Sequence, residues 1–583
     1  MDMNAGIICA VLLWTTLPIG IPAAAPMKQF SGNFPTKSEG LPIDTIFQLP
    51  SALPAWPSGS NFSRGIIDLG GLQVSQVSTF NKIWGTYDGG PDDQGFAIFE
   101  PSGIPEGFST LGSYAQPNNK PFFGWVLVGK DVSTNSSNPS LKQPIDYTQV
   151  WNSTSDDGLV FFWLPTAPNG YQAVGHVVTT TPDKPSLDKI KCVRLDLTDQ
   201  CETNSWIWGF NSFNVYDVRP SNRGIQAPGV PVGTFVAQNG ENTGPLSIAC
   251  LKNNNTLSTY MPNLQQIEEI LKVYAPTMYL HPDEEYLPSS VNWFFSNGSL
   301  LYKKGEESNP VTIALNGTNL PQDANSDDAY WLDLPADDEN KDRVKKGDLQ
   351  SANTYAHVKP MLGGTFTDIA LWVFYPFNGS GRLRVKFSFI KLNIKLGKIG
   401  EHVGDWEHVT LRVSNFNGQL LQVYFSQHNK GVWVDSSQLE FQSGNKPVVY
   451  SSLHGHASYP HVGMNLRESS KIDGIGEYKI DGIGVRNDTD KSDLVMDMGA
   501  YELVSAEYLG SAVVEPPWLN YFREWGPKIS YKLDDELDKI RRALPGKLKS
   551  LVEKIIKSLP NEILGQEGPT GPKVKDNWSG DEV

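Results

Sequence analysis

The sequence contains little cysteine, little charge and few long apolar runs. Only four of its 583 residues are cysteine, and 19% are charged. No two cysteines are spaced as Cys-x-x-Cys, so a structural zinc knuckle is not indicated. No segment after residue 25 is apolar enough to cross a bilayer. An excess of positive charge is also lacking: the net charge is −16, which argues against a nucleic-acid partner.

Glycine, proline and aromatic residues are abundant instead. The chain has 54 glycines and 41 prolines, and 11% of its residues are aromatic. This composition favours loop-rich β structure over helical bundles. The length is typical of about two to four domains. We therefore predict a mainly β protein of several domains.

Residues 1–25 have the features of a signal peptide. An apolar run from Ile7 to Ile21 precedes three alanines at 23–25. A membrane anchor is the alternative, although Pro18 and Pro22 interrupt the short run. Sequons for N-glycosylation lie at Asn61, Asn135, Asn152, Asn254, Asn297, Asn316, Asn378, Asn487 and Asn577. These features predict a secreted or vacuolar glycoprotein.

The three cysteines that remain after signal cleavage leave two interpretations. Cys192 and Cys201 are close enough in sequence to close a small disulfide loop, which would leave Cys250 unpaired. Three buried thiols are the alternative.

A weak internal repeat predicts the architecture of residues 45–236. The segments GFAIFEPSGIPEGFSTLGSYA and GLVFFWLPTAPNGYQAVGHVV both pass from an apolar strand into a proline turn and then a glycine. A looser third copy, VYDVRPSNRGIQAPGVPVGTF, ends near Gly233. Three such units predict a pseudo-three-fold β-prism or a β-sandwich.

The remaining chain divides by composition into three parts. Residues 237–261 are polar and predict a linker, and residues 262–530 alternate strands and turns, which predicts a β-sandwich domain with a few helices. The tail, 531–583, has apolar residues at helical spacing between Leu544 and Leu559, which predicts an amphipathic helix. We expect this helix to pack on the β domain; binding to a membrane surface is the alternative.

Histidine is unevenly distributed. Eight of the nine histidines lie between residues 281 and 461, several of them beside carboxylates, as in HPDEEY and EHVGDWEH. Imidazole nitrogen and carboxylate oxygen are common ligands of divalent cations. The pattern therefore indicates a metal site in this part of the chain.

Residues 401–408 are the most specific candidate. Asp405 and Glu407 are two apart in a predicted strand, so both point to one face and Trp406 to the other. His402 precedes them at a turn marked by Gly400 and Gly404. We predict one divalent cation on His402, Asp405 and Glu407; the pattern does not distinguish Mg, Ca, Mn and Zn. A hydrogen-bonded network without metal is the alternative.

Further residues around this motif are candidates for supporting roles. Arg382, Arg384 and Lys386 alternate with apolar residues, so one strand face is basic and would attract an anion; a half-exposed strand made soluble by its cations is the alternative. Candidate general bases are His454, His456 and Glu401. Candidate supporting residues are His281, Asp283 and His408, although His281 and Asp283 would equally stabilise a turn.

Four segments carry a resemblance to a known family. They are YAPTMYLHPDEEYLPSSVNWFF, LGKIGEHVGDWEHVTLRVSNFNG, PVVYSSLHGHASYPH and GQEGPTGPKVKDNW. They resemble a plant family related to vacuolar protein sorting-associated protein 62, over roughly residues 45–580. The family name implies a role in sorting or scaffolding and little about mechanism.

The C-terminal domain also distantly resembles the necrosis- and ethylene-inducing-peptide-like proteins. Their Gly-His-Arg-His-Asp-Trp-Glu motif binds a divalent cation, and its metal ligands fall on His402, Asp405 and Glu407. Gly404 replaces the second histidine, and Asn378 lies where an upstream aspartate is expected. The resemblance implies recognition of a sugar-bearing lipid head group by a toxin-like protein.

Three functions follow from these observations. The first is a binding protein, with a possible role in defence, that recognises an anionic glycan or phospholipid head group at a membrane surface. The second is a metal-dependent hydrolase, in which the cation activates water. The third is a vacuolar sorting or scaffold protein with a structural metal. The first is our expectation, because only one compact ligand cluster is recognisable.

Overall fold

The computed structural model describes residues 40–583 except 135–136, 156, 241–243, 388–389, 429, 468–482, 529–530, 543, 545, 547, 558–563, 565–567 and 583. The predicted signal peptide, residues 1–25, lies outside the described residues. Strands make up 39% and helices 15% of the described residues, so the prediction of a mainly β protein is confirmed. Among the described residues no helix is long and apolar enough to span a membrane.

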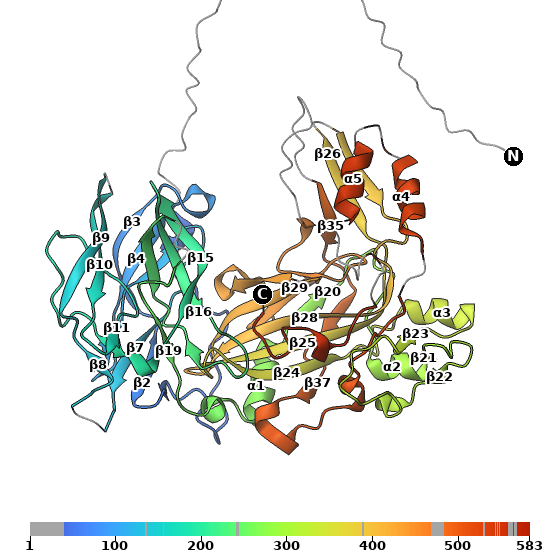
Figure 1. The fold of residues 1–583 in the computed structure, drawn as a ribbon, viewed down its shortest axis with the longest axis horizontal. Coiled ribbons are helices and arrows are strands. Elements are labelled where there is room, and N and C mark those ends of the chain that lie inside the picture. Colours follow the sequence, from blue (N-terminus) through green and yellow to red (C-terminus); the bar gives the residue numbers. More distant parts are fainter. Residues whose placement is uncertain are drawn as a thin grey trace, which may run out of the picture. The chain divides into compact units, whose positions relative to one another are not determined.

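Three of the antiparallel three-stranded sheets in the N-terminal half follow one another in sequence order (Figure 1). They consist of β3 (Phe80–Thr86), β4 (Phe96–Pro101) and β6 (Tyr114–Pro117); β9 (Asp146–Ser155), β10 (Gly158–Thr166) and β12 (Val177–Thr179); and β15 (Cys201–Phe210), β16 (Phe213–Pro220) and β18 (Phe235–Asn239). In each sheet the second strand lies in the middle. Each copy of the sequence repeat therefore contributes one sheet.

The repeats meet where their glycines lie. Leu111, Val174 and Val232, each of which precedes a repeat glycine, pack in one apolar cluster. A Cβ atom on Gly112 would come within 2.9 Å of the Cα of Gly175. Glycine is needed there because the backbones of two repeats approach too closely for a side chain.

Three further sheets complete this half, one of four strands and two of three short strands. They are β1 (Ile66–Asp68), β2 (Leu72–Val77), β7 (Val126–Asp131) and β5 (Ser109–Thr110); β8 (Leu141–Lys142), β13 (Cys192–Arg194) and β11 (Tyr171–Gln172); and β14 (Thr198–Asp199), β19 (Cys250–Lys252) and β17 (Gly229–Val230). Residues 237–261, expected to be a linker, contain β19, which pairs with both β14 and β17. The polar segment is therefore part of the sheet structure, because backbone pairing requires no apolar pattern.

The predicted disulfide is wrong. Cys201 is bonded to Cys250, and Cys192 is a buried free thiol. Asp199 pairs with Cys250 in the β14–β19 ladder, and Cys201 follows two residues later. Strand pairing thus joins cysteines that are 49 residues apart, whereas proximity in sequence favoured Cys192.

A six-stranded sheet is the centre of the C-terminal half. Its order is β30 (Lys430–Asp435), β29 (Leu420–Gln427), β28 (His402–Ser414), β25 (Phe366–Asn378), β24 (Thr354–Met361) and β37 (Tyr501–Ser505). Every residue of β25 and β28 is buried. Both faces of the sheet are covered, so a polar side chain in either strand is buried whichever way it points.

One apolar core lies on each face of this sheet. Alternate residues of β25 and β28, such as Val373 and Val409, pack with α1 (Leu264–Tyr274) in one core. Their neighbours, such as Trp372 and Trp406, pack with α2 (Val291–Ser296) in the other. The first core also includes residues of a sheet that is formed by β31 (Phe441–Gln442), β32 (Lys446–Ser451), β33 (Ser458–Tyr459), β20 (Thr277–Tyr279) and β36 (Val495–Asp497). Beside the second core lie β22 (Val311–Thr312), β21 (Leu300–Lys303), β23 (Tyr330–Asp333) and α3 (Asp338–Lys345).

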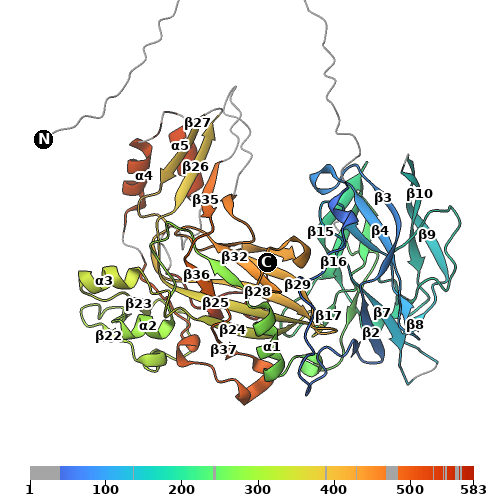
Figure 2. The ribbon, with the colours of Figure 1, turned by 180° about the vertical axis from the view of Figure 1, so that it is seen from behind.

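The tail forms two helices where one was predicted. They are α4 (Leu533–Arg542) and α5 (Leu548–Lys557). Both lie beside the sheet of β27 (Ile390–Lys395), β26 (Arg382–Phe387), β35 (Ile483–Thr489) and β34 (Gly463–Arg467), as both views show (Figures 1 and 2). Ile540 and Ile556 pack in one apolar cluster with Leu383 of β26. The apolar helix faces therefore cover protein, as the packing interpretation of the tail expected.

Candidate functional site

Gly404 determines which side chains of β28 lie together. Opposite β25, Asp405 pairs with Tyr375 and Val403 with Phe377. Strict alternation would place Asp405 and Val403 on one face and His402 on the other. Gly404 has φ +72°, however, and Val403 packs in the core that contains Trp406. The change of direction at this glycine brings His402 to the face of Asp405 and Glu407.

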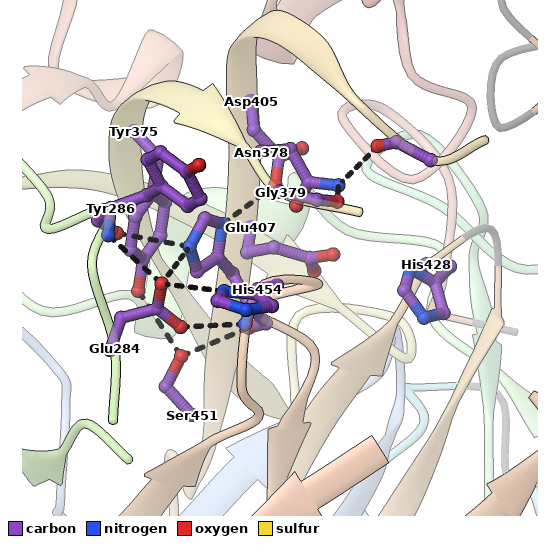
Figure 3. Close-up of polar contacts among 12 residues, drawn as sticks. Glu284, Tyr286, Tyr375, Asn378, Gly379, Asp405, Glu407, His428, Ser451 and His454 are labelled. Carbon is purple, nitrogen blue, oxygen red and sulfur yellow. Dashed lines mark hydrogen bonds and ion pairs between the residues drawn. The ribbon is translucent and has the colours of Figure 1, made fainter. Parts of the chain in front are cut away.

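These three side chains line one small cavity. Its volume is about 60 Å³. His402, Asp405 and Glu407 are 7%, 7% and 5% exposed. In Figure 3 the Glu407 side chain extends to the side on which His428 lies. The other polar lining residues are Asn378, Ser380, Arg382, His428, Arg486, Asn487 and Lys575.

Three buried polar atoms of this group have no hydrogen-bond partner among the described residues: His402 Nδ1, Asn378 Oδ1 and Asn487 Nδ2. The first two can act as ligands of a cation. An unpaired buried polar atom costs roughly 1–3 kcal/mol, so such an atom in a folded protein requires an explanation. Within the described part of the chain, no three His, Cys, Asp or Glu side chains are placed as a ready-made metal cluster. The donors thus line a common space without forming a closed ligand set.

His456 holds Asp405 from behind the cavity. Its Nδ1 lies 3.2 Å from Asp405 Oδ2, and its Nε2 lies 3.1 Å from the Tyr286 carbonyl oxygen. The ring stacks on Tyr375 with centroids 3.8 Å apart. Both ring nitrogens face oxygen acceptors, so the ring is held in place from both sides.

The charge of Asp405 is stabilised by its neighbours. Burial by itself would raise the pKa of Asp405, but the hydrogen bond from His456 and the nearby His402 lower it to about 2. The carboxylate is therefore ionised at neutral pH. An ionised carboxylate at the edge of a cavity is an oxygen donor for a cation.

Sequence reasoning missed Glu284, which organises the next layer (Figure 3). Its carboxylate accepts a hydrogen bond from the backbone N–H of His454 at 2.6 Å and lies 3.3 Å from His454 Nδ1. Burial would raise the pKa of Glu284, but the contact with His454 and the charge of His456 hold it below its usual value. The HPDEEY segment was the sequence signal for this carboxylate. The residue predicted from that segment was Asp283, whereas the buried carboxylate is that of Glu284.

The structure places the predicted general bases away from the cavity wall. Neither His454 nor His456 is among the lining residues. Glu401 accepts a hydrogen bond from Ser380 at 2.8 Å and does not line the cavity either. His281 Nδ1 accepts a hydrogen bond from the backbone N–H of Asp283, which is the turn interaction named as the alternative.

The predicted basic residues of β26 differ in whether they line the cavity. Arg382 lines the cavity and its guanidinium lies 3.5 Å from His454 Nε2. Arg384 instead contacts Met464, and the side chain of Lys386 lies outside the described residues. Arg486 and Lys575 are the other basic lining residues. No local pattern in the sequence pointed to them, because they are distant along the chain.

His408 belongs to the opposite face of β28. Its ring stacks on Trp372, and its Nε2 lies 3.1 Å from Glu582. It is therefore not a neighbour of the cavity, contrary to the prediction. Its position follows from alternation, since one residue separates it from the face of Glu407.

Two of the predicted sequons lie inside this site. Asn378 and Asn487 both line the cavity and are buried. A glycan cannot be accommodated on either amide in the folded protein. The prediction of a glycoprotein therefore depends on the other sequons.

Comparisons with known proteins add a family and one structural similarity. No curated protein matches the sequence significantly. The crystal structure of GNIP1Aa from Chromobacterium piscinae is similar at 21% identity, over 35% of this chain and 40% of that chain, with a TM-score of 0.26. The sequence model described as vacuolar protein sorting-associated protein 62 matches residues 43–582. The chain therefore belongs to this family, whose name connects it with the vacuolar branch of the secretory pathway.

Proposed function

We propose that this protein binds an anionic sugar or phospholipid head group through a divalent cation held by His402, Asp405 and Glu407. The observation that carries the proposal is the pair of buried, unpartnered atoms, His402 Nδ1 and Asn378 Oδ1, in the cavity that also contains both carboxylates. A cation would give each of these atoms a partner.

The donor chemistry fits such an ion. One imidazole nitrogen, two carboxylates and an amide oxygen are ligands that divalent cations accept. Asp405 is fixed by His456, and an oriented carboxylate is typical of metal sites. Small movements of the side chains are required, because the donors do not form a closed set as placed among the described residues.

The size and charge of the cavity limit the ligand. A volume of about 60 Å³ holds an ion and a few waters, since one water needs roughly 10–15 Å³ on this measure. A whole sugar ring does not enter. Arg382, Arg486 and Lys575 are the basic lining residues. Arg486 is paired with Asp488 at 2.6 Å, so Arg382 and Lys575 are the cations that would attract an anion to the mouth. The cation and these residues would together bind the charged group of a larger ligand.

This arrangement supports binding more than hydrolysis. A hydrolase needs a base within hydrogen-bond reach of the metal-bound water. The predicted bases His454, His456 and Glu401 do not line the cavity, and His428, which does, lies 3.4 Å from Asn487 Oδ1. A purely structural metal in a scaffold protein would not need these cationic lining residues.

The wider biology follows from the sequence. We propose that residues 1–25 direct the chain into the secretory pathway, from which it is secreted or sorted to the vacuole. The distant resemblance to necrosis- and ethylene-inducing-peptide-like proteins supports a toxin-like role in defence. The ligand would then be a sugar-bearing or phosphorylated lipid head group on a membrane.

The test is the metal content of the purified protein together with its binding to vesicles. The variants are His402→Ala/Asp405→Ala and the control Asp283→Ala, which removes an exposed carboxylate outside the cavity. We expect wild type and control to hold about one divalent ion per chain and to bind vesicles that contain phosphatidic acid or glycosylated sphingolipid. The double variant should lose the ion and vesicle binding while keeping its circular dichroism spectrum. A wild-type protein without metal in buffers that supply Mg, Ca, Mn and Zn would refute the proposal.

A further inference from the structure

A second, larger cleft lies apart from the proposed metal site. Its volume is about 600 Å³, and it shares no lining residue with the small cavity. One side consists of residues from β6, β15 and β16, and the other of residues from β29 and β30. This volume is typical of sites that bind small molecules.

The residues that line the cleft include equal numbers of positive and negative charges. Four are cationic and four are anionic: Lys120, Arg219, Arg223 and Arg412, with Asp217, Asp435, Asp581 and Glu582. Most are paired with one another; Lys120 contacts Asp435, and Asp581 bonds both Arg223 and Arg412. A net charge of zero favours neither a free anion nor a free cation. In this respect the cleft differs from the small cavity.

The lining offers both donors and acceptors beside each other. The Asn204 amide donates to the Asp217 carboxylate at 2.8 Å, and the Gln422 amide donates to Asp435 at 2.8 Å. The indole N–H of Trp433 is buried and has no acceptor among the described residues. Such groups suit a ligand whose own groups both donate and accept, as hydroxyl groups do.

Aromatic rings occur on both sides. Trp206 of β15 is 43% exposed although it is a large aromatic residue. Across the cleft, the Trp433 ring of β30 stacks on the Arg412 guanidinium at 3.9 Å. Exposed aromatic residues with a polar handle are the usual anchors of binding sites.

We infer that this cleft binds a neutral oligosaccharide. Its C–H faces would pack on Trp206 and Trp433, and its hydroxyls would bond the amide–carboxylate pairs. This function goes beyond the proposed head-group recognition and does not depend on the metal site. The protein then has two recognition sites, one for an anionic group and one for an uncharged sugar chain.

The experiment is isothermal titration of the full-length protein with defined tetrasaccharides. The neutral probes are the tetramers of cellulose, xylan, mannan and amylose, and the acidic probe is tetragalacturonate. Trp206→Ala and Asn204→Ala remove cleft residues that are exposed, so folding is retained. Phe210→Ala is the matched control, because this aromatic residue ends the same strand, is 57% exposed and does not line the cleft.

We expect at least one neutral tetrasaccharide to bind, with affinity reduced roughly tenfold or more by Trp206→Ala. Asn204→Ala should also weaken binding, whereas Phe210→Ala and the metal-site variant Asp405→Asn should bind as wild type does. The inference is overturned if no neutral probe binds at millimolar concentration. It is also overturned if tetragalacturonate binds best, or if neither cleft variant weakens binding.

Discussion

The two faces of β28 both bury ionisable side chains, but they differ in how these are paired. On one face, His408, Thr410 and Arg412 contact the segment 577–582: Glu582 bonds His408 and Thr410, and Asp581 bonds Arg412 at 2.6 Å. On the other face, His402 Nδ1 and Asn378 Oδ1 have no partner among the described residues. The charged groups of the first face are paired, which indicates a structural role, although the indole N–H groups of Trp372 and Trp406 on that face have no acceptor among the described residues. The unpartnered atoms of the other face line a cavity, which indicates a binding site.

The paired face extends over neighbouring strands. Lys359, Asp368 and Arg412 lie side by side in the ladders of β24, β25 and β28. Lys359 Nζ donates to the carbonyl oxygens of Asn577 and Gly580. Segment 577–582 therefore places two carboxylates beside Lys359, His408 and Arg412, and the sheet holds this segment as it would hold a ligand.

The largest effect should come from removing Arg412. Its guanidinium bonds Asp368 at 2.8 Å and Asp581 at 2.6 Å, so Arg412→Leu leaves two buried carboxylates without their main partner. We expect a loss of about 3–5 kcal/mol in the free energy of unfolding, measured by urea denaturation. Arg219→Leu is the control, because that side chain is 30% exposed where it pairs with Glu202, and it should cost less than about 1 kcal/mol. Equal effects of the two variants would remove the distinction between paired and unpaired faces.

The second-largest effect should be a loss of folding stability at acid pH, caused by protonation of carboxylates on the paired face. Burial would raise the pKa values of Glu582 and Asp581, but His408 and Lys359 lower that of Glu582, and Arg412, Arg223 and Lys359 lower that of Asp581. Both pKa values end below the unfolded values, so the stability they provide is present at neutral pH and is lost as the pH falls below about 4.5. We expect roughly 2 kcal/mol less stability at pH 3 than at pH 6 from these groups. The measurement is urea unfolding across this pH range for wild type and Glu582→Gln.

The comparison of wild type with Glu582→Gln isolates the contribution of one of the two carboxylates. Glu582→Gln should lower stability at pH 6 and flatten the pH dependence, because one of the two titrating groups is gone. An unchanged pH profile would assign the acid sensitivity to carboxylates elsewhere in the molecule.

The local part of the site was predictable from the sequence, and the remainder was not. Asp405 and Glu407 share a face because they are two residues apart in a strand, and this spacing is visible in the sequence. His402 joins them only because Gly404 has a positive φ inside β28. The sequence indicated a turn at this glycine, whereas the strand continues through it.

Residues from distant parts of the chain carried no such signal. His428, Arg486 and Lys575 reach the cavity from later parts of the chain, and strand register over such distances cannot be derived from local pattern. The disulfide failed for the same reason, since Cys250 reaches Cys201 through strand pairing. The fold class was recoverable because composition and the repeat glycines report short-range structure.

The smallest effect is expected for His402→Leu, which removes one of two histidines that meet Asp405 from different sides. His456 is bonded at both nitrogens and stacked on Tyr375, so His456→Leu leaves Asp405 and the Tyr286 carbonyl without this donor and should cost about 2–3 kcal/mol. His402→Leu removes a ring whose Nδ1 bonds nothing in the described structure, so in metal-free buffer we expect a change within about 1 kcal/mol. Addition of a divalent cation should then raise the melting temperature of wild type and of His281→Leu, a turn variant outside the cavity, but not that of His402→Leu. If His402→Leu is as costly as His456→Leu without metal, His402 is a structural residue, and both faces of β28 serve the fold alone.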